Sequence, residues 1–151
     1  MVQGLVRTLM RLSVLLLALW LASCASHAPQ LLPELSVPAQ DALRGTPAES
    51  LLASADEAAG SGRDQAASLY LERAIRLAPN SSWLYKKMAD LRLSEGDAHG
   101  AEGFARHALR NAQAGDTAYR ASLYELLATC LTRQGDTDGA DAARQQAQQL
   151  Q

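Results

Sequence analysis

The sequence has few of the residues that build β-sheets. Its 151 residues include only four valines and one isoleucine, and three of the valines lie within the first 14 positions. β-Branched and aromatic side chains are the ones that fit the pleated surface of a strand. Alanine and leucine, which favour helices, number 29 and 26. The composition therefore excludes a β-sandwich, a β-barrel and an α/β sheet, and it predicts one all-α domain.

Basic residues are scarce as well. The chain has 14 lysines and arginines against 16 aspartates and glutamates, a formal net charge of −2, and only two of the basic residues are lysines. A protein that binds nucleic acid by neutralising phosphates needs a basic stripe that releases counterions. The charge therefore excludes a nucleic-acid partner of that kind.

An N-terminal segment has the organisation of an export signal. Arg7 and Arg11 precede residues 12–21, a run in which only Ser13 is polar. The run is too short to span a bilayer, which takes about 20 apolar residues. A short apolar run behind basic residues is typical of a secretory signal. We therefore expect residues 1–23 to be a signal peptide.

The end of this segment, Leu21-Ala22-Ser23-Cys24, resembles the lipobox of bacterial lipoproteins. The resemblance implies cleavage between Ser23 and Cys24 and acylation of Cys24. Three acyl chains would hold the protein on a membrane, whereas one chain binds only marginally. Since Ala25 rather than aspartate follows the cysteine, the resemblance also implies export to the outer membrane, with the chain facing the periplasm.

Residues 24–45 are predicted to be the acylated cysteine and a flexible tether. Three prolines (Pro29, Pro33 and Pro38) interrupt this stretch, and it shows no sustained helical period. A flexible chain of this length has an end-to-end distance of roughly 25 Å. With Cys24 acylated, Cys130 has no partner for a disulfide, and we interpret it as a small apolar core residue.

Small residues recur through the rest of the chain, residues 46–151, with spacings of 34 and then 39. They are Ala55, Gly62, Ala67 and Ala74, then Ala89, Gly96, Ala101 and Ala108, then Ala128, Gly135, Ala140 and Ala147. A period of 34 is typical of the tetratricopeptide repeat, a pair of helices joined by a turn. The chain resembles that family, which implies three helical hairpins at about residues 48–81, 82–115 and 121–151, stacked as a short right-handed α-solenoid.

The expected turns carry suitable residues. The three recurring glycines stand where a left-handed residue ends the first helix of each pair. Asp97 and Asp136 follow two of them and can cap the second helices. Thr46, Pro47 and Glu49 resemble a capping box with proline at the first helical position. The extra residues before the third repeat, 116–120, are expected to lengthen its first helix.

The first helices of a tetratricopeptide stack line a concave groove. Helical phase predicts that it includes Leu52, Asp56, Trp83, Lys86, Lys87, Asp90, Ser94, Ser122, Glu125, Leu126, Thr129 and Arg133. Trp83 is the only tryptophan after Cys24, and Lys86 and Lys87 are the only lysines. Tryptophan with nearby charges suits an interaction hot spot. The alternative is that Trp83 packs over the helix start and the lysines are solvated.

The sequence shows no catalytic constellation. His99 and His107 are eight residues apart, not the four that place two metal ligands side by side on a helix, and His27 lies in the predicted tether. No nucleophile–histidine–acid motif and no glycine-rich phosphate loop is present. We therefore predict no catalytic residue, no metal site, no cofactor and no small-molecule substrate.

Lipobox, short tether and a minimal repeat domain together resemble the LpoP-type lipoproteins, which activate bifunctional class A penicillin-binding proteins. The resemblance implies a non-enzymatic regulator of peptidoglycan synthesis, anchored to the outer membrane by Cys24 and bound to such a synthase. A pilotin-like assembly factor for a secretin or type IV pilus is an alternative, although pilotins usually carry more repeats. Another envelope scaffold is a third interpretation.

Overall fold

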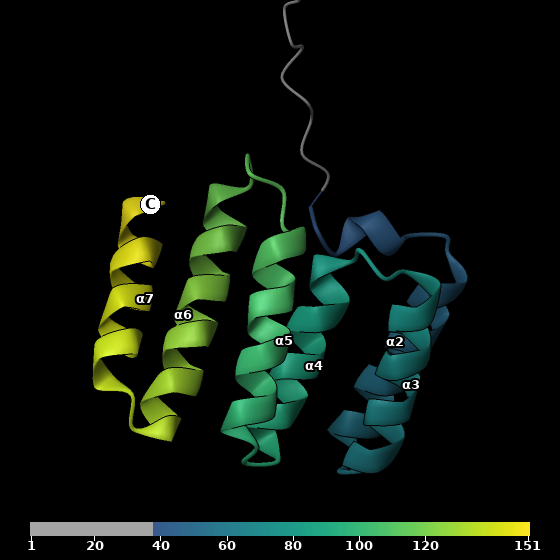
Figure 1. Ribbon diagram of the computed structural model, residues 1–151. Coiled ribbons are helices and arrows are strands. Elements are labelled where there is room, and N and C mark those ends of the chain that lie inside the picture. The colour runs from purple at the N-terminus through teal and green to yellow at the C-terminus, as the bar shows by residue number, and fades with distance from the viewer. Residues whose placement is uncertain (1–37) are drawn as a thin grey trace, which may run out of the picture. The chain divides into compact units, whose positions relative to one another are not determined.

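The computed structural model describes residues 38–151, and the predicted signal peptide, cleavage site and Cys24 lie outside the described residues. Six α-helices follow one another, and no strand occurs among residues 38–151. They are α2 (Pro47–Gly60), α3 (Asp64–Leu77), α4 (Ser82–Ser94), α5 (Ala98–Asn111), α6 (Thr117–Gln134) and α7 (Thr137–Gln149), preceded by the short 3-10 helix η2 (Asp41–Leu43). Consecutive helices pair as α2 with α3, α4 with α5, and α6 with α7 (Figure 1). This confirms the all-α prediction of three helical hairpins.

The recurring alanines are the positions where paired helices touch. All nine are at most 2% exposed: Ala55, Ala67, Ala74, Ala89, Ala101, Ala108, Ala128, Ala140 and Ala147. A methyl side chain lets two helix backbones approach closely, and the ridges of side chains on the two helix surfaces set the angle at which the helices cross. Leu84 and Met88 of α4 are fully buried and belong to the first core cluster together with residues of α2 and α3, so they fill the space between the first two hairpins. Leu123 of α6 is also fully buried. The alanine-rich composition therefore follows from the packing.

The turns have the predicted chemistry. Gly62, Gly96 and Gly135 have φ angles of 68°, 84° and 84°, in the left-handed region where a side chain is strained. Asp97 accepts a hydrogen bond from the Gly100 amide at 2.8 Å, and Asp136 accepts the equivalent bond at 2.9 Å. Each of these two aspartates satisfies an amide that the helix leaves without a partner.

The capping prediction for Thr46 is wrong in its detail. Thr46 precedes α2 and Pro47 is the first helical residue, but the Thr46 hydroxyl makes no cap bond. It donates instead to the carbonyl of Leu43, the last residue of η2, at 2.6 Å. Glu49 accepts the Gly45 amide at 2.7 Å. Leu43 itself is 3% exposed and belongs to the first core cluster. Packing against the domain therefore begins within the stretch predicted to be the tether.

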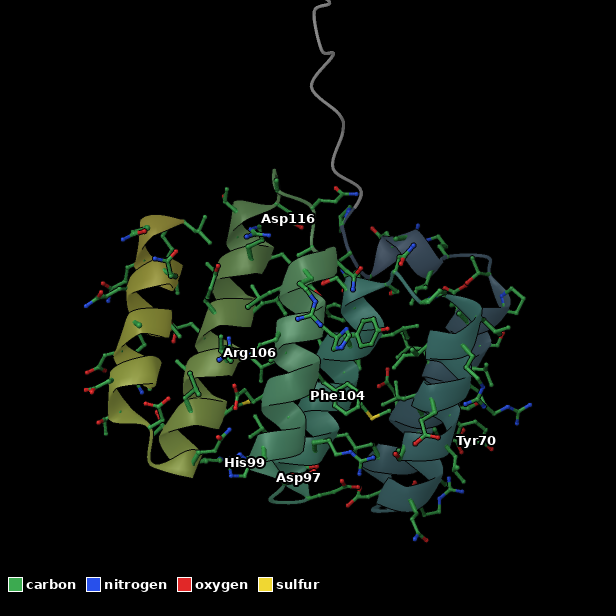
Figure 2. The ribbon with its side chains drawn as sticks, in the orientation of Figure 1. Tyr70, Asp97, His99, Phe104, Arg106 and Asp116 are labelled. Atoms are coloured by element: carbon green, nitrogen blue, oxygen red, sulfur yellow. The ribbon has the colours of Figure 1, made fainter. Side chains whose placement is uncertain are left out.

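Polar bonds join the second and third helical pairs. Helix α6 has 18 residues against 13 or 14 in the others, as the extra residues before it predicted. Near its C-terminal end, Arg133 donates to the Leu93 carbonyl at 2.7 Å and Gln134 donates to the Ala98 carbonyl at 3.0 Å. Phe104 of α5, labelled in Figure 2, packs against both the first and second core clusters.

Every helix among residues 38–151 is too short or too polar to span a bilayer.

Candidate partner-binding cleft

The structure brings predicted groove residues of α2 and α4 together. Lys87 Nζ lies 2.8 Å from Asp56 Oδ1, and Lys86 Nζ lies 2.7 Å from Asp90 Oδ2. Both ammonium groups also lie over the indole of Trp83, at 5.6 Å and 5.8 Å from the ring centroid. Each lysine is therefore paired with a carboxylate, and this network does not present a basic surface.

Trp83 packs against the domain and keeps part of its surface exposed. Its side chain is half-buried and packs against the first core cluster. Its ring centroid is 6.1 Å from that of Tyr119, at an interplanar angle of 39°. Tilted aromatic pairs at this separation are mutually stabilising. The indole is thus fixed from the side of α6, while part of its surface stays accessible to a partner.

Of the predicted residues Glu125, Thr129 and Arg133 on α6, only Arg133 bonds another helix within residues 38–151. Glu125, Thr129 and Arg133 are exposed. The Thr129 hydroxyl donates to the Glu125 carbonyl at 2.9 Å, and the Arg133 guanidinium donates to the Leu93 carbonyl at the end of α4. Arg133 therefore ties α6 to α4. A role for these three residues in partner binding stays a prediction.

An open cleft of about 350 Å³ lies between α2 and α4, with α3 forming its floor. We call it the α2–α4 cleft. Its lining residues are Ala55, Asp56 and Ala59 from α2, Asp64, Ala67 and Leu71 from α3, and Lys87, Asp90, Leu91 and Ser94 from α4. Asp56, Lys87, Asp90 and Ser94 were predicted groove residues, whereas Leu52 is not part of the lining. The α3 residues Asp64, Ala67 and Leu71 were missed because helical phase predicted a groove lined by the first helix of each pair alone.

Buried titratable groups lie away from the cleft. Burial raises the pKa of Tyr119 to about 12, and burial raises the pKa of the Cys130 thiol to about 11. Cys130 is fully buried, which confirms that it is a core residue. His107 is exposed and stacks on Tyr85 with ring centroids 5.0 Å apart. In the part of the chain that the structure describes, no group of three acidic, histidine or cysteine residues is arranged to hold a metal.

A solved structure reveals the relationship to known proteins. The globular C-terminal domain of P. aeruginosa LpoP is 41% identical to this chain, and the match covers 68% of the chain and 95% of that domain with a TM-score of 0.63. The chain belongs to the LpoP family. No protein-family model and no curated protein matches it. The similarity between the two proteins thus extends over nearly the whole LpoP globular domain. It agrees with the all-α fold of three helical pairs described above.

Proposed function

We propose that this LpoP-family chain is an outer-membrane lipoprotein that binds a class A penicillin-binding protein from the periplasmic side and stimulates its peptidoglycan synthesis. The observation that carries the proposal is the 41% identity across 95% of the LpoP globular domain. The lipobox supports the anchor, with cleavage after Ser23 and acylation of Cys24. The chain acts by binding and is not itself an enzyme.

The surface around Trp83 supports a binding role. Tryptophan side chains dominate the binding energy of many interfaces when surrounding contacts exclude water. The two lysine–aspartate pairs and Tyr119 hold the indole in place before a partner arrives. Less conformational freedom is then lost on association, and more of the contact energy appears as affinity.

The short tether limits where the partner can be met. Thirteen residues lie between Cys24 and Pro38, the first described residue, so 14 residue-to-residue steps join the two. An extended chain spans at most about 3.6 Å per residue, so Pro38 stays within about 50 Å of an acylated Cys24. In this proposal the synthase has to extend toward the outer membrane to reach the domain.

The test uses the mature chain with Cys24→Ser, which removes the acyl chains, and the class A penicillin-binding protein encoded in the same genome. We expect the chain to bind this synthase and to raise the initial rates of glycan polymerisation and crosslinking. Trp83→Ala should weaken binding by about 2 kcal/mol, or about 30-fold in Kd. Tyr70→Ala on α3 is the matched control, since Tyr70 also packs against the first core cluster but is not part of the network of Trp83 with the two lysine–aspartate pairs.

Three results would argue against parts of the proposal. No stimulation by the unaltered chain refutes the function, and capture of a secretin from solubilised envelopes would favour the assembly-factor alternative. Unchanged binding by Trp83→Ala, with an unchanged helical circular-dichroism signal, refutes the role of Trp83. In cells, a Cys24→Ala chain that still fractionates with the outer membrane refutes the lipid anchor.

A further inference from the structure

The α2–α4 cleft combines an apolar floor with an acidic rim. Ala55, Ala67 and Leu71 at the bottom are at most 3% exposed. Asp56, Asp64 and Asp90 all line the same cleft. Its volume of about 350 Å³ has room for a long side chain. An apolar surface with charged groups at its edge matches a side chain that has an aliphatic stem and a charged head.

The charged residues of the cleft determine whether the charged group of a bound side chain is positive or negative. Lys87 is the one cationic side chain in the lining, and its ammonium already bonds Asp56 at 2.8 Å. Lys86 lies outside the lining and bonds Asp90 through Oδ2. Even with Lys86 counted, three carboxylates face two ammonium groups, and Asp64 makes no ion pair within residues 38–151.

We propose that the α2–α4 cleft receives an arginine or lysine side chain of the penicillin-binding protein. The aliphatic stem lies on the alanine and leucine floor, and the cationic head bonds Asp64 and the open oxygen of Asp90. This inference rests on the proposed function, because it names the contact that the partner makes at the site.

Other occupants fit the cleft less well. An acidic side chain would meet three aspartates and find the single lining lysine already bonded, and like charges brought together disfavour binding. A purely apolar side chain would take the Asp64 carboxylate out of water without giving it a partner, which is unfavourable. A basic side chain satisfies both the floor and the rim.

Binding of the Cys24→Ser chain to the periplasmic part of the synthase tests the inference. Asp64→Asn should raise Kd by about 3- to 10-fold, the loss of one charge-assisted bond at a partly solvated site. Ser94→Phe, at the exposed mouth of the cleft, should weaken binding similarly by filling the space while leaving all three carboxylates. Asp138→Asn is the control, because Asp138 stands in the first turn of α7 as Asp64 does in α3, but lies outside the cleft. Asp138→Asn should change Kd by less than about two-fold.

Salt dependence separates a direct charge contact from a structural effect. Raising the ionic strength should weaken binding of the unaltered chain more than binding of Asp64→Asn, because the lost contact is the screened one. If the unaltered chain binds and both cleft variants bind equally well, the cleft inference is overturned and the proposed function stands. If Asp64→Asn weakens binding but its Kd depends on salt as strongly as the Kd of the unaltered chain, Asp64 makes no contact with a cation and the inference also fails. If the unaltered chain does not bind the synthase, both the cleft inference and the proposed function fail.

Discussion

Replacing Ser82 with alanine should loosen the junction between the second and third helical pairs. Ser82 is the first residue of α4 and is only 5% exposed. Its hydroxyl donates its single proton to the Ala108 carbonyl near the end of α5, at 2.7 Å. The Tyr119 hydroxyl of α6 lies 3.1 Å from Ser82 Oγ, so Tyr119 is the donor in that second bond. One buried oxygen therefore joins three helices.

The size of the effect follows from these two bonds. Each hydrogen bond contributes roughly 0.5–1.5 kcal/mol net to the free energy of unfolding. A buried polar group that is left without a partner increases the destabilisation further. Ser82→Ala should therefore lower the free energy of unfolding by about 2 kcal/mol, or Tm by about 10 °C in a domain of this size. Tyr119→Phe removes only the second bond and should lower the free energy by about 1 kcal/mol.

Urea unfolding followed by far-ultraviolet circular dichroism measures both variants and the double variant Ser82→Ala/Tyr119→Phe. Because Tyr119 depends on Ser82 for its bond, the double variant should be little less stable than Ser82→Ala alone, which is the signature of coupled residues. Strict additivity of the two losses, or a Ser82→Ala loss below about 0.5 kcal/mol, would show that the shared hydroxyl does not organise this junction.

Two further predictions concern the backbone and the core. Gly103→Ala lies within α5 with open space around the added methyl group, so it should stabilise the domain by about 0.5–1 kcal/mol. Gly96 has a φ of 84°, so Gly96→Ala should destabilise the domain by at least about 1 kcal/mol. Thermal melts in which both substitutions shift Tm in the same direction would contradict this pair of predictions. Burial raises the pKa of Cys130 from 9.0 to about 11, so the folded state holds the thiol proton more tightly and stability should fall as pH rises from 9 to 11. Cys130→Ala should remove that part of the pH dependence, and iodoacetamide should label Cys130 only on unfolding; rapid labelling of the folded chain at neutral pH would contradict its burial.

The repeat architecture was predictable because its signal is periodic and local. Each recurring alanine marks a place where two helices approach, and each glycine marks a turn that needs a left-handed residue. Both constraints act at fixed spacings along the chain, so they survive in the sequence without knowledge of the tertiary structure. The aspartate caps are local for the same reason, since Asp97 and Asp136 each bond an amide three residues ahead.

The cleft was only half predictable because its parts come from different helical pairs. Helical phase places Asp56, Lys87 and Asp90 on the exposed side of α2 and α4. It does not show that Lys87 bonds Asp56, 31 residues away, or that α3 contributes Asp64 to the cleft lining. Tyr119 was missed as a structural residue because it lies in the insertion before the third repeat, where the repeat pattern carries no information. Such contacts depend on how one pair of helices packs on the next.

The paired lysines change how mutations at this site have to be interpreted. Lys86→Glu/Lys87→Glu looks in the sequence like the removal of a basic hot spot. In the structure it places new carboxylates beside Asp56 and Asp90, each of which loses its partner. Like charges repel at such distances, so the variant disturbs the network that holds Trp83 and the wall of the cleft. Loss of binding in that variant would therefore not show that the lysines touch the partner. Asp64→Asn changes one cleft charge and leaves both lysine pairs intact, and for that reason it is the more informative substitution.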